Sequence, residues 1–389
     1  MNIGILGFGT VGSGVYEIIK NSRSSFLNEV QVVKILDLPQ NKGKLDIITS
    51  NIKDIIEDKN IDLVVETIGG IHPAYEFIMS ALRNKKHVVT ANKAVVAAYL
   101  MEFLHEAKNN DVHFLFEAST GGGIPWLSNI QKAKRIDNID SFYGIFNGTS
   151  NFILDYMYSY NKGFDDSLKL AQELGYAEAN PSADIDGFDV QNKVVISSAL
   201  CFDTFLDIKS FPCFSMANIN FDDIQYLKEK NCTVKYIGEA HVLNEEYEAF
   251  VMPNIFPFSS MEANVKTNFN MITLNGETIG NLKFYGQGAG KLPTANAIVQ
   301  NIIDIKTNVI DSKINIDKVI PYNNNLLENK FLIRSKFSFE SPLINNVDLY
   351  KESFYMYTNS IKTKDLIELI KDIIEKDKNA FIAKIENFR

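Results

Sequence analysis

Cysteine, tryptophan and histidine are scarce in this chain of 389 residues, which has three cysteines, one tryptophan and five histidines. Cys201, Cys213 and Cys232 are odd in number and lack the spacing of a metal site. This cysteine usage indicates a reduced, cytoplasmic protein. The histidines also lack the spacing of a catalytic triad or a metal site, and we interpret each of them as structural.

Long apolar runs and an excess of basic charge are also missing. No stretch approaches the ~20 apolar residues that cross a membrane. The net charge is −9 and basic residues are interleaved with acidic ones, which excludes the concentrated basic surface that nucleic acids need. Met1 leads into an apolar run without a charged leader or a cleavage site, so we interpret that run as a buried strand. The expected partner is a small molecule, with no nucleic acid and no membrane.

Short apolar runs alternate with helical periods in the first third of the chain. Strands are predicted at 2–6, 30–36, 61–66, 87–90 and 112–117, and helices at 73–84 and 94–108. This alternation is typical of an α/β domain with a doubly wound parallel sheet. We therefore expect a Rossmann-type dinucleotide-binding domain over 1–128, completed by a segment at 286–310.

The pattern changes in the rest of the chain. Strands are predicted at 139–146, 233–243, 247–251 and 271–274, and helices at 125–134, 151–160, 164–174, 188–201 and 294–306. We expect a second, α+β domain over 129–285 that binds substrate and dimerises. The last segment, 326–389, is predicted as a small α+β module with the order strand, long loop, strand, helix, strand.

A glycine-rich turn, GFGTVG, follows the first predicted strand and opens a helix. Gly7 permits a tight turn, Gly9 lets the backbone approach a pyrophosphate, and Gly12 lets the helix pack closely on the sheet. The helix N-terminus adds amide donors and the positive end of a dipole. A turn that only connects strand and helix is the alternative. The cofactor-binding residues predicted here are Gly7, Phe8, Gly9, Thr10, Val11 and Gly12.

Asp37 ends the second predicted strand, where an acid can bond the 2′-hydroxyl of the adenosine ribose. No arginine follows it to receive a 2′-phosphate, which favours NAD. Lys42 and Lys44 could fold back towards the ribose. The choice between NAD and NADP therefore stays open.

Acidic residues gather between positions 175 and 193. Asp189 and Lys193 are four positions apart on a predicted helix and so share one face. Taken alone, such a pair is often only a surface ion pair. The same segment also carries Glu178, Asp184 and Asp186. Carboxylates hold an ammonium group and a lysine transfers a proton, so the segment indicates an oxidoreductase that acts on a small cationic substrate.

Five motifs in order span roughly positions 1–310: VVTANKA, FEASTGGGIPWL, GIFNGTSNFIL, AQELGYAEANPSADIDGFDVQNK and GQGAGKLPTANA. Together they resemble homoserine dehydrogenase. The resemblance implies a reversible, NAD- or NADP-dependent reduction of L-aspartate 4-semialdehyde to L-homoserine, in the biosynthesis of threonine, methionine and isoleucine. We also expect a homodimer or a homotetramer.

The resemblance assigns roles to individual residues. Lys193 would transfer the proton, Asp189 would orient substrate and lysine, and Lys93 would lie beside both cofactor and substrate. Glu178 would bind the substrate amino group, with Asp184 in support. The other implied residues are Gly148, Thr149 and Tyr176 for the substrate and Thr67, Gly69 and Gly286 for the cofactor.

Glu117 and the turn at 120–124 offer one carboxylate and several main-chain carbonyls in a short span, which suits a hard cation. The resemblance implies a site for Na⁺ or another monovalent cation, formed by the Glu117 side chain and the carbonyls of Thr120, Gly122 and Ile124. A solvated acid at the end of a strand is the alternative.

The chain departs from the family pattern at two places. Asn180 stands where the family often has an acid, and Ser119 and Thr120 replace small or branched apolar residues before the glycines. Neither position touches Lys193. These departures bear on substrate affinity and on the choice of cation, and not on the proton carrier.

Two alternative functions accompany this interpretation. A phosphorylating semialdehyde dehydrogenase would need a nucleophilic cysteine, whereas Cys201 lies in an apolar helical run and is predicted to be core. A nonenzymatic dinucleotide-sensing protein would not need Lys193 or Asp189.

The segment 326–389 resembles part of a βαββαβ module of the ACT type without its first helix, and an interface or dimerisation element is the alternative there.

Overall fold

The structure is a computed structural model that describes residues 1–41, 43–309, 314, 316 and 318–386. The chain divides into two compact units. Unit 1 consists of Met1–Ile136, Ala199–Asp203 and Gly286–Asp317, and unit 2 consists of Asp137–Ser198, Thr204–Tyr285 and Lys318–Arg389. Within the described ranges, no helix is both long enough and apolar enough to cross a membrane.

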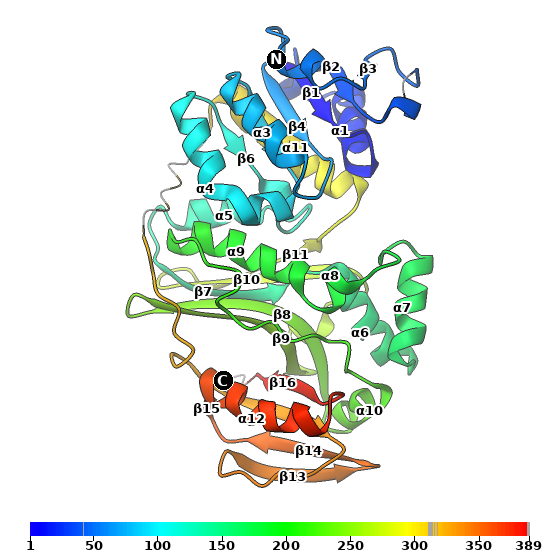
Figure 1. Ribbon diagram of the computed structural model, residues 1–389, viewed down its shortest axis with the longest axis vertical. Coiled ribbons are helices and arrows are strands. Elements are labelled where there is room, and N and C mark those ends of the chain that lie inside the picture. Colours follow the sequence, from blue (N-terminus) through cyan, green and yellow to red (C-terminus); the bar gives the residue numbers. More distant parts are fainter. Residues whose placement is uncertain (42, 310–313, 315, 317, 387–389) are drawn as a thin grey trace. The chain divides into compact units, whose positions relative to one another are not determined.

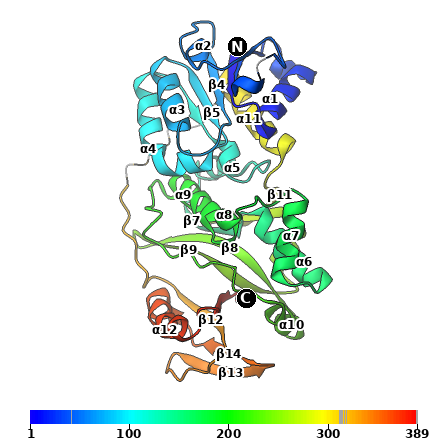
Figure 2. The same cartoon turned by 45° about the vertical axis from the view of Figure 1, so that its right-hand side comes forward.

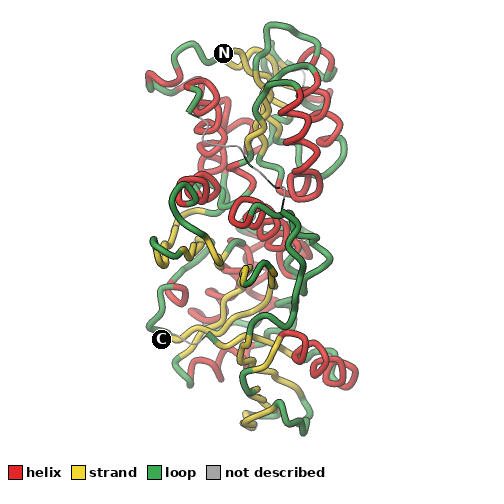
Figure 3. The backbone as a smooth tube through the Cα atoms, turned by 90° about the vertical axis from the view of Figure 1, so that its left-hand side faces the viewer, coloured by secondary structure: helices red, strands yellow, loops and turns green. Residues whose placement is uncertain are grey.

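Unit 1 is built on a six-stranded parallel sheet with the strand order β3-β2-β1-β4-β5-β6. The strands are β1 (Asn2–Leu6), β2 (Gln31–Leu36), β3 (Ile48–Thr49), β4 (Leu63–Glu66), β5 (His87–Thr90) and β6 (Phe114–Leu115). The central strands are buried because helices cover both faces of the sheet (Figure 3). This is the doubly wound sheet that the alternating pattern predicted.

The helices of unit 1 are α1 (Thr10–Asn21), α2 (Lys53–Ile56), α3 (Ala74–Arg83), α4 (Lys93–Asn109), α5 (Trp126–Ala133) and α11 (Lys291–Thr307). Helices α1 and α11 pack together on the sheet although they are far apart in the sequence (Figure 1). Their shared core contains Ile3, Ile5 and Val15 with Ile298 and Ile302. Chain that returns after unit 2 thus completes the dinucleotide-type fold.

Unit 2 contains a larger mixed sheet with the order β11-β10-β7-β8-β9-β16-β12-β14-β13, and β15 pairs with β12. Its strands are β7 (Ile139–Ile145), β8 (Cys232–Leu243), β9 (Glu246–Pro257), β10 (Phe269–Gly276), β11 (Gly280–Gln287), β12 (Glu328–Ser335), β13 (Ile344–Tyr350), β14 (Ser353–Thr358), β15 (Ile361–Lys362) and β16 (Phe381–Ile385). Its helices are α6 (Gly148–Tyr160), α7 (Phe164–Glu173), α8 (Ser182–Ile185), α9 (Phe188–Phe202), α10 (Phe221–Glu229) and α12 (Thr363–Lys376).

Several of these elements were not predicted. Strand β9 continues to Pro257, past the predicted end at Val251, and pairs with β8 along its whole length. Strands β11 and β13 lie at the two edges of the sheet, where half-exposed side chains weaken the alternation. The expected fifth strand, 112–117, is shorter, because Glu117 already begins a 3₁₀ turn.

The C-terminal segment is an integral part of unit 2. Strand β16 pairs with β9 in parallel, so the sheet runs from the middle of the chain into its last strands (Figure 2). The long loop expected between the first two C-terminal strands is wrong, because β13 occupies part of it. The element order, β12-β13-β14-β15-α12-β16, has no helix after its first strand within the described residues, as the incomplete ACT-like pattern indicated.

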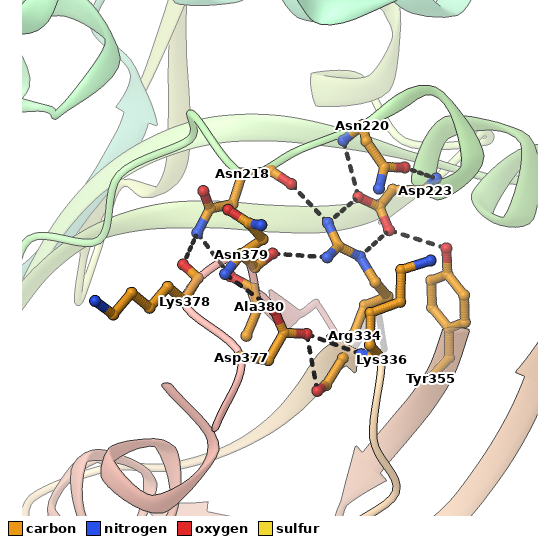
Figure 4. A network of polar contacts seen from close by, with 11 residues as sticks. Asn218, Asn220, Asp223, Arg334, Lys336, Tyr355, Asp377, Lys378, Asn379 and Ala380 are labelled. Carbon is orange, nitrogen blue, oxygen red and sulfur yellow. Dashed lines mark hydrogen bonds and ion pairs between the residues drawn. The ribbon is translucent and has the colours of Figure 1, made fainter. Parts of the chain in front are cut away.

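A buried ion pair ties this segment to α10. Both oxygens of Asp223 accept hydrogen bonds from Arg334, each at 2.9 Å, and the two side chains are 0% and 3% exposed (Figure 4). Tyr355 also donates to Asp223, and the remaining guanidinium bonds go to the carbonyls of Asn218 and Asn379. The two charges therefore compensate each other away from water.

We expect Arg334→Met to destabilise the protein by about 3–5 kcal/mol, because it leaves the Asp223 carboxylate buried without its counter-charge. Thermal unfolding followed by circular dichroism measures this loss, and hydrogen exchange in β12 and β16 localises it. The double variant Arg334→Met/Asp223→Asn should recover part of the stability.

The control is Lys351→Ala. Lys351 forms an exposed ion pair with Asp222 of the same helix, α10, and its removal should change Tm far less than Arg334→Met does. Equal losses in Arg334→Met and Lys351→Ala would contradict a special role for the buried pair.

Candidate active site

The glycine turn has the tight turn and the close helix packing that its sequence predicted. Gly7 has a φ of +93°, and a Cβ added to Gly12 would lie 2.0 Å from the Gly7 oxygen. A Cβ on Gly9 would meet nothing within 4 Å, and no side chain caps the first amides of α1. Thr67 donates from Oγ1 to the carbonyls of Leu6 and Gly7, both at 3.0 Å, and so braces the turn.

The other predicted residues of this turn have ordinary positions. Phe8 and Val11 are half-buried and Thr10 is exposed. The ring of Phe8 contacts that of Tyr16 edge-on, with centroids 5.7 Å apart. This contact fixes the turn against the body of α1.

Glu66, which we did not predict, ends β4 and is fully buried. Its Oε1 accepts from the amides of Ile68 at 2.7 Å and Gly69 at 3.3 Å, and its Oε2 accepts from Thr90 Oγ1 at 2.6 Å. Burial raises the pKa of Glu66 because the charged form loses its hydration. The carboxyl group therefore fixes the loop that carries Thr67 and Gly69.

Lys93 is the first residue of α4 and is half-buried. The preceding Asn92 caps the helix through a bond from the Val95 amide, and its Nδ2 donates to the Gly70 carbonyl at 2.6 Å. A cation at this position faces the positive end of the helix dipole, which local helix stability does not favour.

Asp37 directly follows β2, at the carboxyl end of the strand, where a ribose would bind. Its Oδ1 accepts from the Leu38 amide and its Oδ2 from Asn41 Nδ2, both at 2.8 Å. These bonds hold the carboxylate in place. Lys44 is exposed, and Lys42 lies outside the described residues.

Glu117 lies in unit 1 with a side chain that is almost completely buried. Its two oxygens accept from the amides of Leu127 at 2.9 Å and Ser128 at 2.7 Å, at the start of α5. Burial raises the pKa of Glu117 to about 7, while these two bonds oppose the shift. The alternative of a solvated acid is wrong, since the carboxyl group is sequestered.

The neighbouring turn contains the carbonyls proposed for the cation. Gly121 and Gly122 have φ values of +86° and +58°, and a Cβ on Gly122 would lie 2.4 Å from the backbone of Gly288. Thr120 is buried with its Oγ1 lacking a partner among the described residues. A Cβ on Gly286 would come within 3.0 Å of Ile124. The GQGAG segment and this turn therefore pack closely within unit 1.

The predicted proton carrier lies in unit 2. Asp189 and Lys193 occupy successive turns of α9, and Lys193 Nζ lies 2.7 Å from Asp189 Oδ2. The two side chains are only 5% and 9% exposed. Lys193 Nζ also donates to the Phe146 carbonyl at 2.7 Å. The alternative of a surface ion pair is therefore wrong.

Asp184 joins this group through Asn147, a residue that we did not predict. The Asn147 Nδ2 donates to Asp184 Oδ1 at 2.7 Å and to Asp189 Oδ2 at 2.8 Å. The signal was present in the sequence, because Asn is a preferred N-cap residue and Asn147 immediately precedes α6.

The remaining predicted substrate residues lie around the start of α6 and the loop after α7. Thr149 donates to the Tyr176 carbonyl at 2.6 Å, and a Cβ on Gly148 would lie 2.7 Å from the Asn268 carbonyl. Tyr176 is 39% exposed. The exposed Glu178 side chain makes no hydrogen bond or ion pair among the described residues. Its carboxylate is thus available to a ligand.

The cysteines do not have the character of a nucleophile. Burial raises the pKa of Cys201 far above its usual range and that of Cys213 to about 12, and the pKa of Cys232 is also raised. A thiolate is the reactive form. The structure therefore disfavours the phosphorylating semialdehyde dehydrogenase alternative.

The six-stranded parallel sheet with its glycine turn, and the buried lysine and carboxylate of unit 2, define a class of protein, the dinucleotide-dependent oxidoreductases. The family models named "Homoserine dehydrogenase, NAD binding domain" and "Homoserine dehydrogenase" match residues 7–117 and 125–303. The chain belongs to the homoserine dehydrogenase family.

Individual relatives agree with this membership. The homoserine dehydrogenase of Bacillus subtilis is 37% identical over 319 residues, which cover 79% of this chain and 73% of the relative. The Synechocystis homoserine dehydrogenase is 37% identical over 326 residues, which cover 81% and 75%. The crystal structure of a homoserine dehydrogenase from Thiobacillus denitrificans matches with a TM-score of 0.90 at 29% identity, covering 100% of this chain and 98% of that one.

Proposed function

We propose that the chain interconverts L-homoserine and L-aspartate 4-semialdehyde with NAD or NADP, with Lys193 as the acid and base of the reaction. The observation that carries this proposal is the buried contact of 2.7 Å between Lys193 Nζ and Asp189 Oδ2, in a family of homoserine dehydrogenases. We also propose a homodimer or homotetramer in the cytoplasm, where the free thiols would stay reduced.

A dinucleotide held at the glycine turn of Gly7, Gly9 and Gly12 would supply or accept the hydride at the carbon that is an aldehyde in one direction and an alcohol in the other. In reduction, the Lys193 ammonium gives a proton to the carbonyl oxygen as negative charge develops there. In oxidation, the neutral amine takes that proton from the hydroxyl group. Asp189 and the Phe146 carbonyl orient the nitrogen of Lys193 through both steps.

The substrate also carries an ammonium group, which needs a carboxylate partner. The exposed Glu178 carboxylate is our candidate, with Asp184 nearby in sequence and Thr149, Gly148 and Tyr176 lining the same part of unit 2. Lys93 would stabilise the alkoxide-like transition state by its positive charge. A nonenzymatic dinucleotide sensor would have no use for a buried lysine held in this way.

We expect the purified protein to oxidise homoserine. We expect Lys193→Ala to lower kcat by about 10² to 10⁴, because a positioned general acid or base typically raises the rate by that factor. Dinucleotide affinity should change little. Initial rates with both dinucleotides, together with titration of dinucleotide binding, measure these effects.

Lys266→Ala is the control, since Lys266 pairs with Asp155 in the same unit and has no assigned role in the reaction. No turnover in wild-type protein that binds dinucleotide would contradict the proposed function. A kcat for Lys193→Ala within a few-fold of wild type would assign the proton to another group.

The choice of dinucleotide provides a second test. Because Asp37 should accept a bond from a ribose 2′-hydroxyl and repel a 2′-phosphate, we expect kcat/KM for NAD to equal or exceed that for NADP. Asp37→Ala should narrow the difference between the two kcat/KM values, because it weakens NAD binding and relieves the repulsion of a 2′-phosphate. A strong NADP preference that disappears in Lys42→Ala would show that this lysine, and not Asp37, determines the dinucleotide preference.

The proposed cation at Glu117 should change stability in a pH-dependent way. The folded-state pKa of about 7 lies above the usual 4.5, so the contribution of Glu117 is fully present below pH 4.5 and is lost as the pH rises through 7. A bound Na⁺ would favour the charged form. We therefore expect NaCl to raise Tm relative to choline chloride at pH 8, and not at pH 4.5.

Glu117→Gln should abolish this sodium-specific shift, whatever its effect on Tm itself. Asp304→Asn, a change of another partly buried acid of unit 1, should retain the shift. A sodium effect that is equal in wild type and Glu117→Gln would exclude Glu117 as a ligand.

A further inference from the structure

Asn147 occupies the short link between β7, which ends at Ile145, and α6, which begins at Gly148. It is 4% exposed. Its Oδ1 accepts from the Ser150 amide at 2.7 Å, which is the N-cap bond of α6. This bond fixes the orientation of the side-chain amide, because the oxygen faces the helix and Nδ2 must then point the other way.

The Nδ2 group points at two carboxylates that come from different helices. It lies 2.7 Å from Asp184 Oδ1 of α8 and 2.8 Å from Asp189 Oδ2 of α9. Two carboxylates that share one amide nitrogen as their donor lie close enough to repel each other. A neutral amide with two N–H groups donates one bond to each and adds no charge.

Asp189 Oδ2 is also the atom that accepts from Lys193. Asn147 and Lys193 therefore meet on one oxygen. The preceding residue contributes as well, because the Phe146 carbonyl accepts from Lys193 Nζ at 2.7 Å and from Asn270 Nδ2 at 2.8 Å. Two consecutive residues thus set the position of the lysine nitrogen and of its carboxylate partner.

We propose that Asn147 is a positioning residue for the hydride-transfer reaction, which holds Asp184 and Asp189 in place through one amide group so that Asp189 presents the lysine to the substrate. This inference rests on the proposed function. Asn147 contacts neither reacting atoms nor the proton in transit, and acts through the two aspartates.

Two substitutions separate this role from the helix cap. Asn147→Ser keeps an oxygen that can cap α6, but it is too short to reach two carboxylates. Asn147→Asp keeps the cap and the shape, but replaces the donor with a third carboxylate. Among the residues that the structure describes, the titratable groups at the site are Asp184, Asp189 and Lys193, with Tyr236 and Cys213 against the Gly187 turn before α9.

For Asn147→Ser we expect kcat for homoserine oxidation to fall about 10- to 100-fold, the order of a lost bond to a charged group, with unchanged dinucleotide affinity. For Asn147→Asp we expect a similar loss. In addition, the acidic limb of the pH profile of kcat/KM should move about one unit to higher pH, because added negative charge favours the ammonium form of Lys193. A purely structural role would lower the amount of active protein without moving the pH profile.

Asn220→Ser is the matched control, because Asn220 caps α10 of the same unit by the same type of bond and should leave kcat unchanged. Wild-type kcat in Asn147→Ser with an unshifted profile in Asn147→Asp would overturn the inference, and so would failure of both variants to fold. If wild type oxidises homoserine and Lys193→Ala does not, these results concern Asn147 alone. If wild type itself is inactive, the proposed function fails first.

Discussion

The short, buried contact between Lys193 and Asp189 constrains the rest of unit 2. A lysine removed from water needs a counter-charge and further acceptors, and the structure provides Asp189 and the Phe146 carbonyl at 2.7 Å each. Those acceptors belong to different elements, α9 and the turn after β7. Strand β7, the turn after it and α9 must therefore all be correctly placed for the ammonium group to keep both hydrogen bonds.

Several residues of the candidate site lie at points where a strand ends and a helix begins. Asn147, Asn92 and the glycine turn each lie where a strand has just ended and a helix begins. Side-chain caps occupy two of these three helix starts, whereas α1 lacks one. That difference fits the proposed function, in which the first amides of α1 would bind phosphate groups and the caps of the other two helices would hold side chains in place.

The sequence allowed prediction of the elements whose pattern is local. The parallel sheet of unit 1, the glycine turn and the shared face of Asp189 and Lys193 follow from periodicity and spacing. Glu66 and Asn147 were missed because their importance depends on partners distant in sequence, Thr90 and the two aspartates. The edge strands β11 and β13 were missed because exposed side chains blur the alternation, and α10 was missed although Asn220 and Asp223 form a readable capping box.

The parallel pairing of β16 with β9 has a consequence for anyone who shortens this chain. Strand β9 spans twelve residues, nearly all buried, and on one side β8 already covers it. Removal of the C-terminal strands would take away the parallel partner of β9 at Asn254 and Ile255 and would leave Glu239 without Lys384, its partner at 2.7 Å. Long apolar strands with an open edge recruit other chains. We therefore expect a truncated form to be more open to self-association at this part of β9.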